Sequence, residues 1–220
     1  MGTSRIEAFS DAVLAIIITI MVLEMDVPHG TGLSALQPML PVFLSYVLSF
    51  VYLGIYWNNH HHMLHVTERV TGGVLWANLH LLFWLTLVPF TTSWMGENGF
   101  APLPTALYGG VLLMAAIAYW ILQRAIVAGE GAESLLATAV GRDLKGNLSP
   151  VLYVLAILAA FVRPWIAGAL YVIVALIWLV PDRRIERTLA RRAVVGSAGG
   201  GSAGGSTGEA RDLRSREGDE

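Results

Sequence analysis

The sequence contains no cysteine, and this absence excludes several kinds of chemistry at once. A chain without cysteine forms no disulfide, no thiolate metal site and no cysteine nucleophile. Charged residues are also scarce, at 14% of the 220 residues, whereas soluble domains carry about a quarter. The formal net charge of −2 gives no electrostatic reason to expect a nucleic-acid partner.

Apolar sequence takes the place of the missing charge, because 55% of the residues are hydrophobic. A helix that crosses a bilayer needs roughly 20 mainly apolar residues. We predict six such spans, at about residues 6–27, 36–57, 72–94, 103–126, 147–162 and 165–181. The last two are short and meet at Arg163-Pro164, where proline breaks a continuous helix. They form either a tight spanning hairpin or a re-entrant pair, and we favour spanning. The sequence therefore predicts an all-α integral membrane protein.

Basic residues are unevenly distributed between the two sides of this topology. Of the 14 Lys and Arg residues, only Arg163 falls on one side, and all the others fall on the opposite side. The positive-inside rule then places both termini in the cytoplasm. Residues 1–195 form the predicted membrane domain. Residues 196–220 begin with a Gly/Ser-rich stretch and end in mixed charge, which predicts a disordered tail.

The first predicted span, "RIEAFSDAVLAIIITIMVLE" (residues 5–24), mixes polar and apolar residues in a helical pattern. At 100° per residue, one face contains Arg5, Phe9, Ala12, Ile16, Ile20 and Leu23, with Thr19 at its margin. Glu7, Ser10 and Asp11 point away from this face, toward neighbouring helices. A carboxylate within a span costs about 3 kcal/mol, so we expect a protein partner for Asp11. Ser10 and Asp11 then either link helices by hydrogen bonds or contact a transported species.

Two short motifs resemble those of a known family. Residues 5–11 read RIEAFSD and resemble the RxxxFSD signature of the transmembrane protein 175 family, in which it opens the first span. Residues 57–61 read WNNHH, similar to a WxxHH pattern at the end of that family's second span. The family consists of cation channels, with single-repeat members in bacteria and a two-repeat form in animal endolysosomes. No TVGYG-like filter is present in the chain, which agrees with this resemblance.

The resemblance implies a homotetramer of six-span subunits in the bacterial cytoplasmic membrane, with the first helices lining a central pore. It matches Ile16 to the pore constriction, Ile20 and Leu23 to further apolar layers, and Thr19 to a position linked to selectivity. The residues matched to support of the pore helix are Arg5, Phe9, Ser10, Asp11, Trp57, His60 and His61. The implied permeant ions are K⁺ and other monovalent cations, with membrane lipids as surroundings and no cofactor. An isoleucine ring would favour potassium by forcing partial dehydration, which costs potassium less than sodium.

The stretch "NNHHHMLH" (58–65) supports competing hypotheses. His61, His65 and Glu68 share one face of a helix, and two histidines with a carboxylate are a plausible metal set. The HExxH motif of zinc proteases is absent, so we expect no metal and no enzyme. The alternative function is a proton-coupled transporter or exchanger that uses Asp11 and the histidines, and an intramembrane metalloenzyme ranks third. His60 and His61 are also candidates for pH sensing.

Overall fold

The computed structural model describes residues 3–65, 67, 69–130 and 144–179, and every secondary-structure element in these ranges is helical. The predicted tail at 196–220 lies outside the described residues. The elements in chain order are α1 (Thr3–Leu23), η1 (Leu33–Met39), α2 (Leu40–His65), α3 (Gly72–Thr86), α4 (Val88–Glu97), α5 (Pro102–Glu130), α7 (Leu144–Val162) and α8 (Pro164–Leu179).

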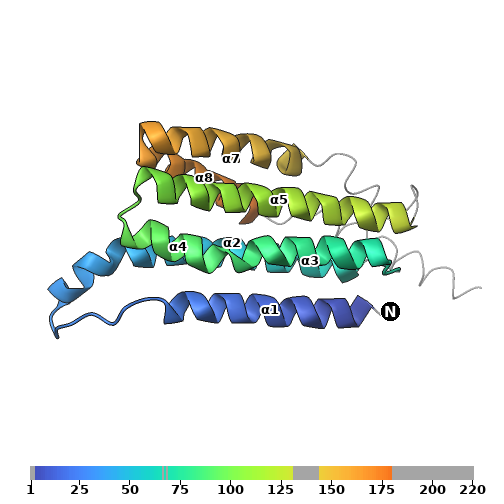
Figure 1. The fold of residues 1–220 in the computed structure, drawn as a ribbon, viewed down its shortest axis with the longest axis horizontal. Coiled ribbons are helices and arrows are strands. Elements are labelled where there is room, and N and C mark those ends of the chain that lie inside the picture. The colour runs from blue at the N-terminus through green and yellow to red at the C-terminus, as the bar shows by residue number, and fades with distance from the viewer. Residues whose placement is uncertain (1–2, 66, 68, 131–143, 180–220) are drawn as a thin grey trace, which may run out of the picture. The chain divides into compact units, whose positions relative to one another are not determined.

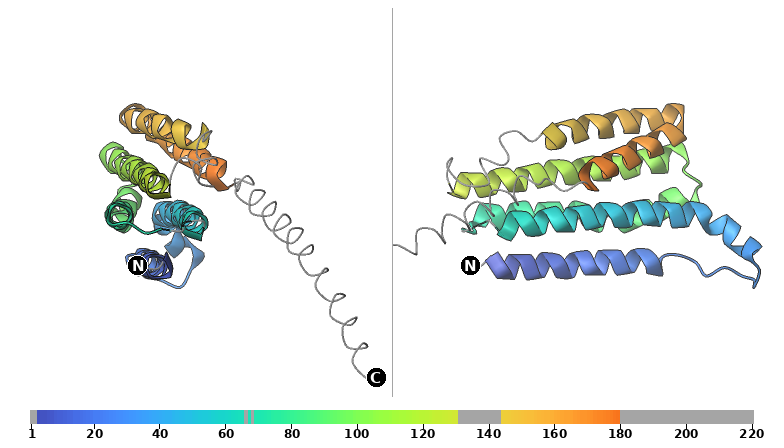
Figure 2. Two further views of the ribbon diagram at one scale, coloured as in Figure 1. Left: turned by 90° about the vertical axis from the view of Figure 1, so that its right-hand side faces the viewer. Right: turned by 180° about the vertical axis from the view of Figure 1, so that it is seen from behind.

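The helices run side by side, and their connections gather at two opposite ends of the bundle (Figure 1). We call the end that holds the start of α1 the near end; it also holds the link between α2 and α3 and the end of α5. The opposite, far end holds residues 24–32, 98–101 and Arg163. Figure 2 shows the same arrangement from the end and from behind. Four segments are long and apolar enough to cross a membrane: Thr3–Leu23, Leu33–His65, Gly72–Glu97 and Pro102–Glu130. Two shorter apolar helices follow, at Leu148–Val162 and Pro164–Leu179.

The helices that contain the first two predicted spans end at other residues than the spans do. The first helix stops at Leu23 rather than near residue 27. Pro28 disfavours helical geometry in the residue before it, and Gly30 has a φ of +131°, so the chain leaves the helix here. The helix that contains the second predicted span does not end at Trp57 but continues as α2 to His65. The Asn59 side chain donates to the Ile55 carbonyl at 2.8 Å, so this polar segment remains compatible with a helix.

The predicted third span is two helices rather than one. Pro89 has no N–H to donate to the carbonyl four residues earlier, and α3 therefore ends at Thr86. The Leu87 N–H bonds the Trp84 carbonyl at 3.2 Å instead, and α4 starts at Val88. The predicted break before Pro164 is confirmed, because α7 ends at Val162 and α8 begins at Pro164.

Two apolar clusters hold the bundle together. The first joins α1 to α5, with α4 contributing Val88, and includes Leu14, Leu53, Leu81 and Leu122. The second joins α2, α4, α5, α7 and α8 around buried tyrosines. Helices α5 and α8 approach closely at Gly109, where an added Cβ would overlap the Tyr171 hydroxyl. The first cluster buries one side of α1 against the bundle.

Candidate functional site

One face of α1 is left uncovered by the other residues that the structure describes. Its large side chains are Phe9, Ile16, Ile20 and Leu23, which are 53%, 57%, 39% and 80% exposed. The shorter Ala12 and Thr19 and the charged Arg5 are exposed as well. In Figure 1, α1 lies at the edge of the bundle. The structure therefore gathers the predicted pore-facing residues on one open face.

The opposite face of α1 is packed against α2, α3 and α4. Its apolar members Leu14, Ile17 and Met21 are at most 3% exposed. Ile16 and Ile17 are thus neighbours in sequence with opposite environments, which follows from the 100° step between successive residues. The Thr19 hydroxyl donates to the Ile16 carbonyl at 2.9 Å, which ties it to the helix beside the predicted constriction.

A buried chain of hydrogen bonds links three helices through Ser10. The Ser10 hydroxyl donates to the Ile6 carbonyl at 2.8 Å and accepts from Asn78 Nδ2 at 2.9 Å. Asn78 Oδ1 lies 2.7 Å from His60 Nε2. Because the Ser10 proton is already used, Asn78 must turn its amide nitrogen to Ser10 and its oxygen to His60. This orientation requires a proton on His60 Nε2. His60 Nδ1 has no partner among the described residues.

Two carboxylates on α1 also have partners on α2. Trp57 Nε1 donates to Asp11 Oδ1 at 3.0 Å, and His61 Nδ1 lies 2.6 Å from Glu7 Oε1. The Trp57 and His61 rings stack, with centroids 6.2 Å apart. The two motifs found in the sequence therefore contact each other. Asp11 has the protein partner that its position in a span predicted.

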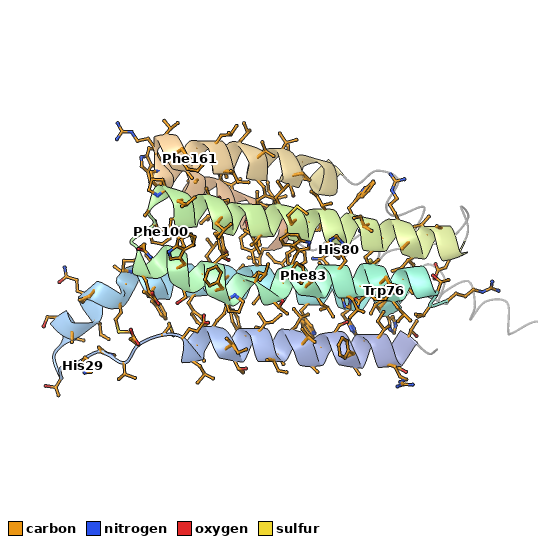
Figure 3. The ribbon with its side chains drawn as sticks, in the orientation of Figure 1. His29, Trp76, His80, Phe83, Phe100 and Phe161 are labelled. Carbon is orange, nitrogen blue, oxygen red and sulfur yellow. The ribbon has the colours of Figure 1, made fainter. Side chains whose placement is uncertain are left out.

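Asn78 is the member of this network that the sequence did not identify as a site residue. It is 1% exposed in the middle of α3 and bonds both Ser10 and His60. Asn78 could have been recognised from the sequence as an amide within an apolar span, because such a group needs hydrogen-bond partners inside the protein. His80, two residues further on, accepts from Trp84 Nε1 at 3.0 Å on the same helix. Figure 3 labels His80 along α3.

The histidine-rich segment does not assemble a metal site in the described ranges. His61 and His65 stack, with ring centroids 6.0 Å apart, but His61 Nδ1 already faces Glu7. No group of three His, Asp or Glu side chains among the described residues is placed to hold a metal ion. Glu68, the third member of the predicted set, lies outside those residues.

Acidic groups lie at the far end of the bundle, next to the last exposed residue of α1. Burial and, to a lesser degree, the nearby charge of Glu97 raise the pKa of Glu24. Glu97 accepts a hydrogen bond from the Ser93 hydroxyl at 2.8 Å. The charge of Arg5, Arg69 and Arg124 lies toward the near end instead.

Comparisons with known proteins identify relatives of this chain. The sequence profile of a family described as "Endosomal/lysosomal potassium channel TMEM175" matches residues 5–89. A potassium channel from Chryseobacterium sp. (strain P1-3) is 54% identical over 189 residues, covering 86% of this chain and 98% of that protein. A potassium channel from Chamaesiphon minutus is 31% identical over 189 residues, covering 79% of this chain and 92% of that protein.

A solved structure also resembles this fold. The crystal structure of a lysosomal potassium-selective channel TMEM175 homolog from Chamaesiphon minutus matches with a TM-score of 0.70 and 29% sequence identity. The match covers 81% of this chain and 96% of that one.

Proposed function

Because this chain belongs to the TMEM175 family, we propose that it forms a potassium-permeable cation channel whose pore is lined by α1. The named relatives are channels, so the chain is a multi-pass membrane protein of a channel family and not an enzyme. The finer features of the proposal are six spans per subunit, a homotetramer, and both termini in the cytoplasm of a bacterium.

The observation that carries the proposal is the uncovered face of α1. Phe9, Ile16, Ile20 and Leu23 alone are compatible with lipid, but the same face also carries the Thr19 hydroxyl and, at its near end, the charge of Arg5. Charged side chains are costly in hydrocarbon, and polar ones there seek protein or water. Four copies of the chain would bring these faces together around a common axis. Such an assembly covers the apolar side chains and keeps the polar ones near water.

The spacing of the exposed residues suggests how this pore would select ions. Ile20 and Leu23 lie about 6 Å and about 10 Å beyond Ile16 along the helix axis. In a tetramer each position becomes an apolar ring, and an ion passes such a ring only by losing part of its hydration shell. Potassium loses water at lower cost than sodium, which gives a moderate preference for potassium. Thr19 would then supply a hydroxyl between the Ile16 and Ile20 rings.

The hydrogen bonds on the other side of α1 would hold these rings in register. Asp11 and Glu7 bond Trp57 and His61 on α2, and Ser10 bonds Asn78 on α3. These contacts lie within the chain and leave the exposed face free. The same contacts weigh against a proton-coupled exchanger, since Asp11 and His61 already have partners.

Electrical recording from the purified full chain in planar bilayers tests the proposal. We expect unitary current steps and, under opposed potassium and sodium gradients, a reversal potential that favours potassium. Substrate flux without unitary steps, coupled to protons at fixed stoichiometry, would establish the transporter instead.

A further inference from the structure

A cavity of about 50 Å³ lies on the side of α2 away from α1, enclosed by α2, α5, α7 and α8. The residues of α2 that line it are Tyr52, Ile55, Tyr56 and Asn59. Trp57 and His61, by contrast, face α1 from the same turns of the helix. A molecule in the cavity would therefore contact the helix that holds α1 without touching α1.

Two polar side chains in the cavity wall have no hydrogen-bond partner among the described residues. Tyr56 is only 9% exposed, and no hydrogen bond is made by its hydroxyl within the described part of the chain. The same is true of the Gln123 amide. The neighbouring tyrosines differ, because Tyr52 donates to the Tyr171 carbonyl at 2.6 Å and Tyr119 donates to the Asn59 carbonyl at 3.3 Å. Among the described residues, the fully buried polar atoms without a partner are His60 Nδ1 and Thr105 Oγ1. The Tyr56 oxygen is therefore reachable from the cavity that it lines and can donate to an acceptor supplied from outside the chain.

The rest of the wall is mostly aromatic. The rings of Tyr56 and Tyr119 meet edge to face with centroids 6.1 Å apart, and Tyr153 and Trp178 complete the wall. By volume the cavity has room for about four water-sized groups. An occupant of this size with an apolar stem fits the rings, and one oxygen on it satisfies the Tyr56 hydroxyl.

The cavity wall reaches the exposed surface of the bundle at Trp120. This side chain is 47% exposed, and the Arg124 guanidinium lies 4.9 Å from its ring centroid. Tryptophan and arginine in this arrangement are typical of the level at which lipid head groups and ester groups lie. A molecule that partitions into this layer would therefore have access to the cavity.

We propose that this cavity binds a hydrogen-bond-accepting oxygen on a slender apolar stem, the chemistry shared by a glycerolipid ester and a short-chain alcohol. The Tyr56 hydroxyl donates to the oxygen, with the Gln123 amide as a second donor, and the tyrosine rings enclose the stem. The site follows from the cavity and its unpartnered donors, and it does not depend on ion conduction by α1.

Photolabelling of the purified full chain in phosphatidylcholine vesicles tests binding directly. The probe is a diazirine-bearing 1-alkanol, and the labelled residues are located by mass spectrometry. We expect label at Tyr56, Tyr119 or Trp120, displaced by excess 1-propanol. Tyr56→Phe should weaken probe binding about fivefold, as expected for the loss of one neutral hydrogen bond.

A pair of variants on α5 separates the cavity from the surface of the helix. Ala116 lines the cavity, so Ala116→Leu should fill it and abolish labelling. Ala128 is exposed on the same helix away from the cavity, and Ala128→Leu should label like the wild type. If Ala116→Leu does not elute from a gel-filtration column at the wild-type position, it is misfolded, and Tyr56→Phe is then the variant that tests the site. Undiminished labelling in both Ala116→Leu and Tyr56→Phe would overturn the proposal.

Native mass spectrometry after delipidation distinguishes the two sources. A glycerolipid retained by the wild type and lost by Ala116→Leu assigns the site to lipid. Displaceable label without a retained lipid assigns it to free alcohols. A wild type with neither label nor retained lipid at the cavity refutes the site. None of these measurements uses ionic current, so their outcome does not depend on whether the chain is a channel.

Discussion

Replacement of Ile16 by asparagine is the perturbation that most directly tests the role assigned to α1. Ile16 is 57% exposed in the subunit, so the folded subunit itself loses little packing when its side chain changes. We expect a change in the free energy of unfolding within about 1 kcal/mol, as for other surface substitutions. In the proposed tetramer the same change places four amides at the narrowest ring, where they can replace part of an ion's hydration shell.

The size of the functional effect follows from the barrier at the ring. If four amides lower the dehydration barrier by about 1.4 kcal/mol, the current rises about tenfold. The current carried by sodium should rise more than the current carried by potassium, because sodium has the higher dehydration cost at an apolar ring. Ile16→Asn should therefore raise the current and bring the reversal potential under potassium/sodium gradients closer to that of a non-selective pore.

The adjacent Ile17 provides the matched control. It is 3% exposed and packs in the core, so Ile17→Asn loses apolar burial and places an amide among apolar groups. The expected cost is about 3–5 kcal/mol, seen as low yield or a lower melting temperature, without a specific change in selectivity. An Ile16→Asn tetramer with unchanged current and unchanged reversal potential would refute the assignment of α1 to the constriction.

Three further predictions concern the contacts of α1 and the far end of the bundle. Asp11→Ala leaves Trp57 Nε1 without its acceptor, so the yield of assembled protein and the melting temperature should fall, with a loss of about 1 kcal/mol in stability, while selectivity is retained. Altered selectivity in a normally assembled variant would place the carboxylate in the ion path. Asn78→Leu removes both bonds to buried groups, and we expect a larger loss of thermal stability than for Asp11→Ala; an equal or smaller loss would show that this amide is not central. Burial and the charge of Glu97 raise the pKa of Glu24 in the folded protein. At pH values between the unfolded and the folded pKa of Glu24, the folded protein therefore binds more protons than the unfolded protein, and the free energy of unfolding falls as pH rises through that window. Glu24→Gln should accordingly raise the melting temperature at pH 7 and have no such benefit below the unfolded pKa near 4.5, whereas a benefit independent of pH would contradict this origin.

The sequence was sufficient to predict the helical class, the exposed face of α1 and the two motifs, because each depends on local order along the chain. Helical periodicity alone separates Ile16 from Ile17, and the structure gives them opposite exposure. The break before Pro164 was predictable for the same reason. The break at Leu87 was also signalled by a proline, but the apolar run through it concealed the signal.

Pairings between helices were not predictable in this way. Asn78 lies 68 residues from Ser10 and 18 from His60, and no local pattern relates the three. The partner of Asp11 likewise depends on how α2 packs against α1, which is a tertiary property. The continuation of α2 to His65 escaped prediction because polar residues there suggested a membrane boundary, whereas a helix can continue beyond the apolar layer.

The hydrogen bonds that link α1 to its neighbouring helices are unevenly distributed along its length. In the part of the chain that the structure describes, its polar bonds to other helices all lie at residues 7–11, toward the near end. Beyond Asp11 the contacts of the helix with the other described residues are apolar, and these have no preferred direction. If the helix tilts, its pivot is therefore expected near Asp11. A tilt of about 5° about that pivot displaces Ile16 by about 0.7 Å and Leu23, some 18 Å away, by about 1.6 Å. Four α1 helices that tilt in this way would change the width of a pore most at the far end of the bundle, while the hydrogen bonds at residues 7–11 stay in place.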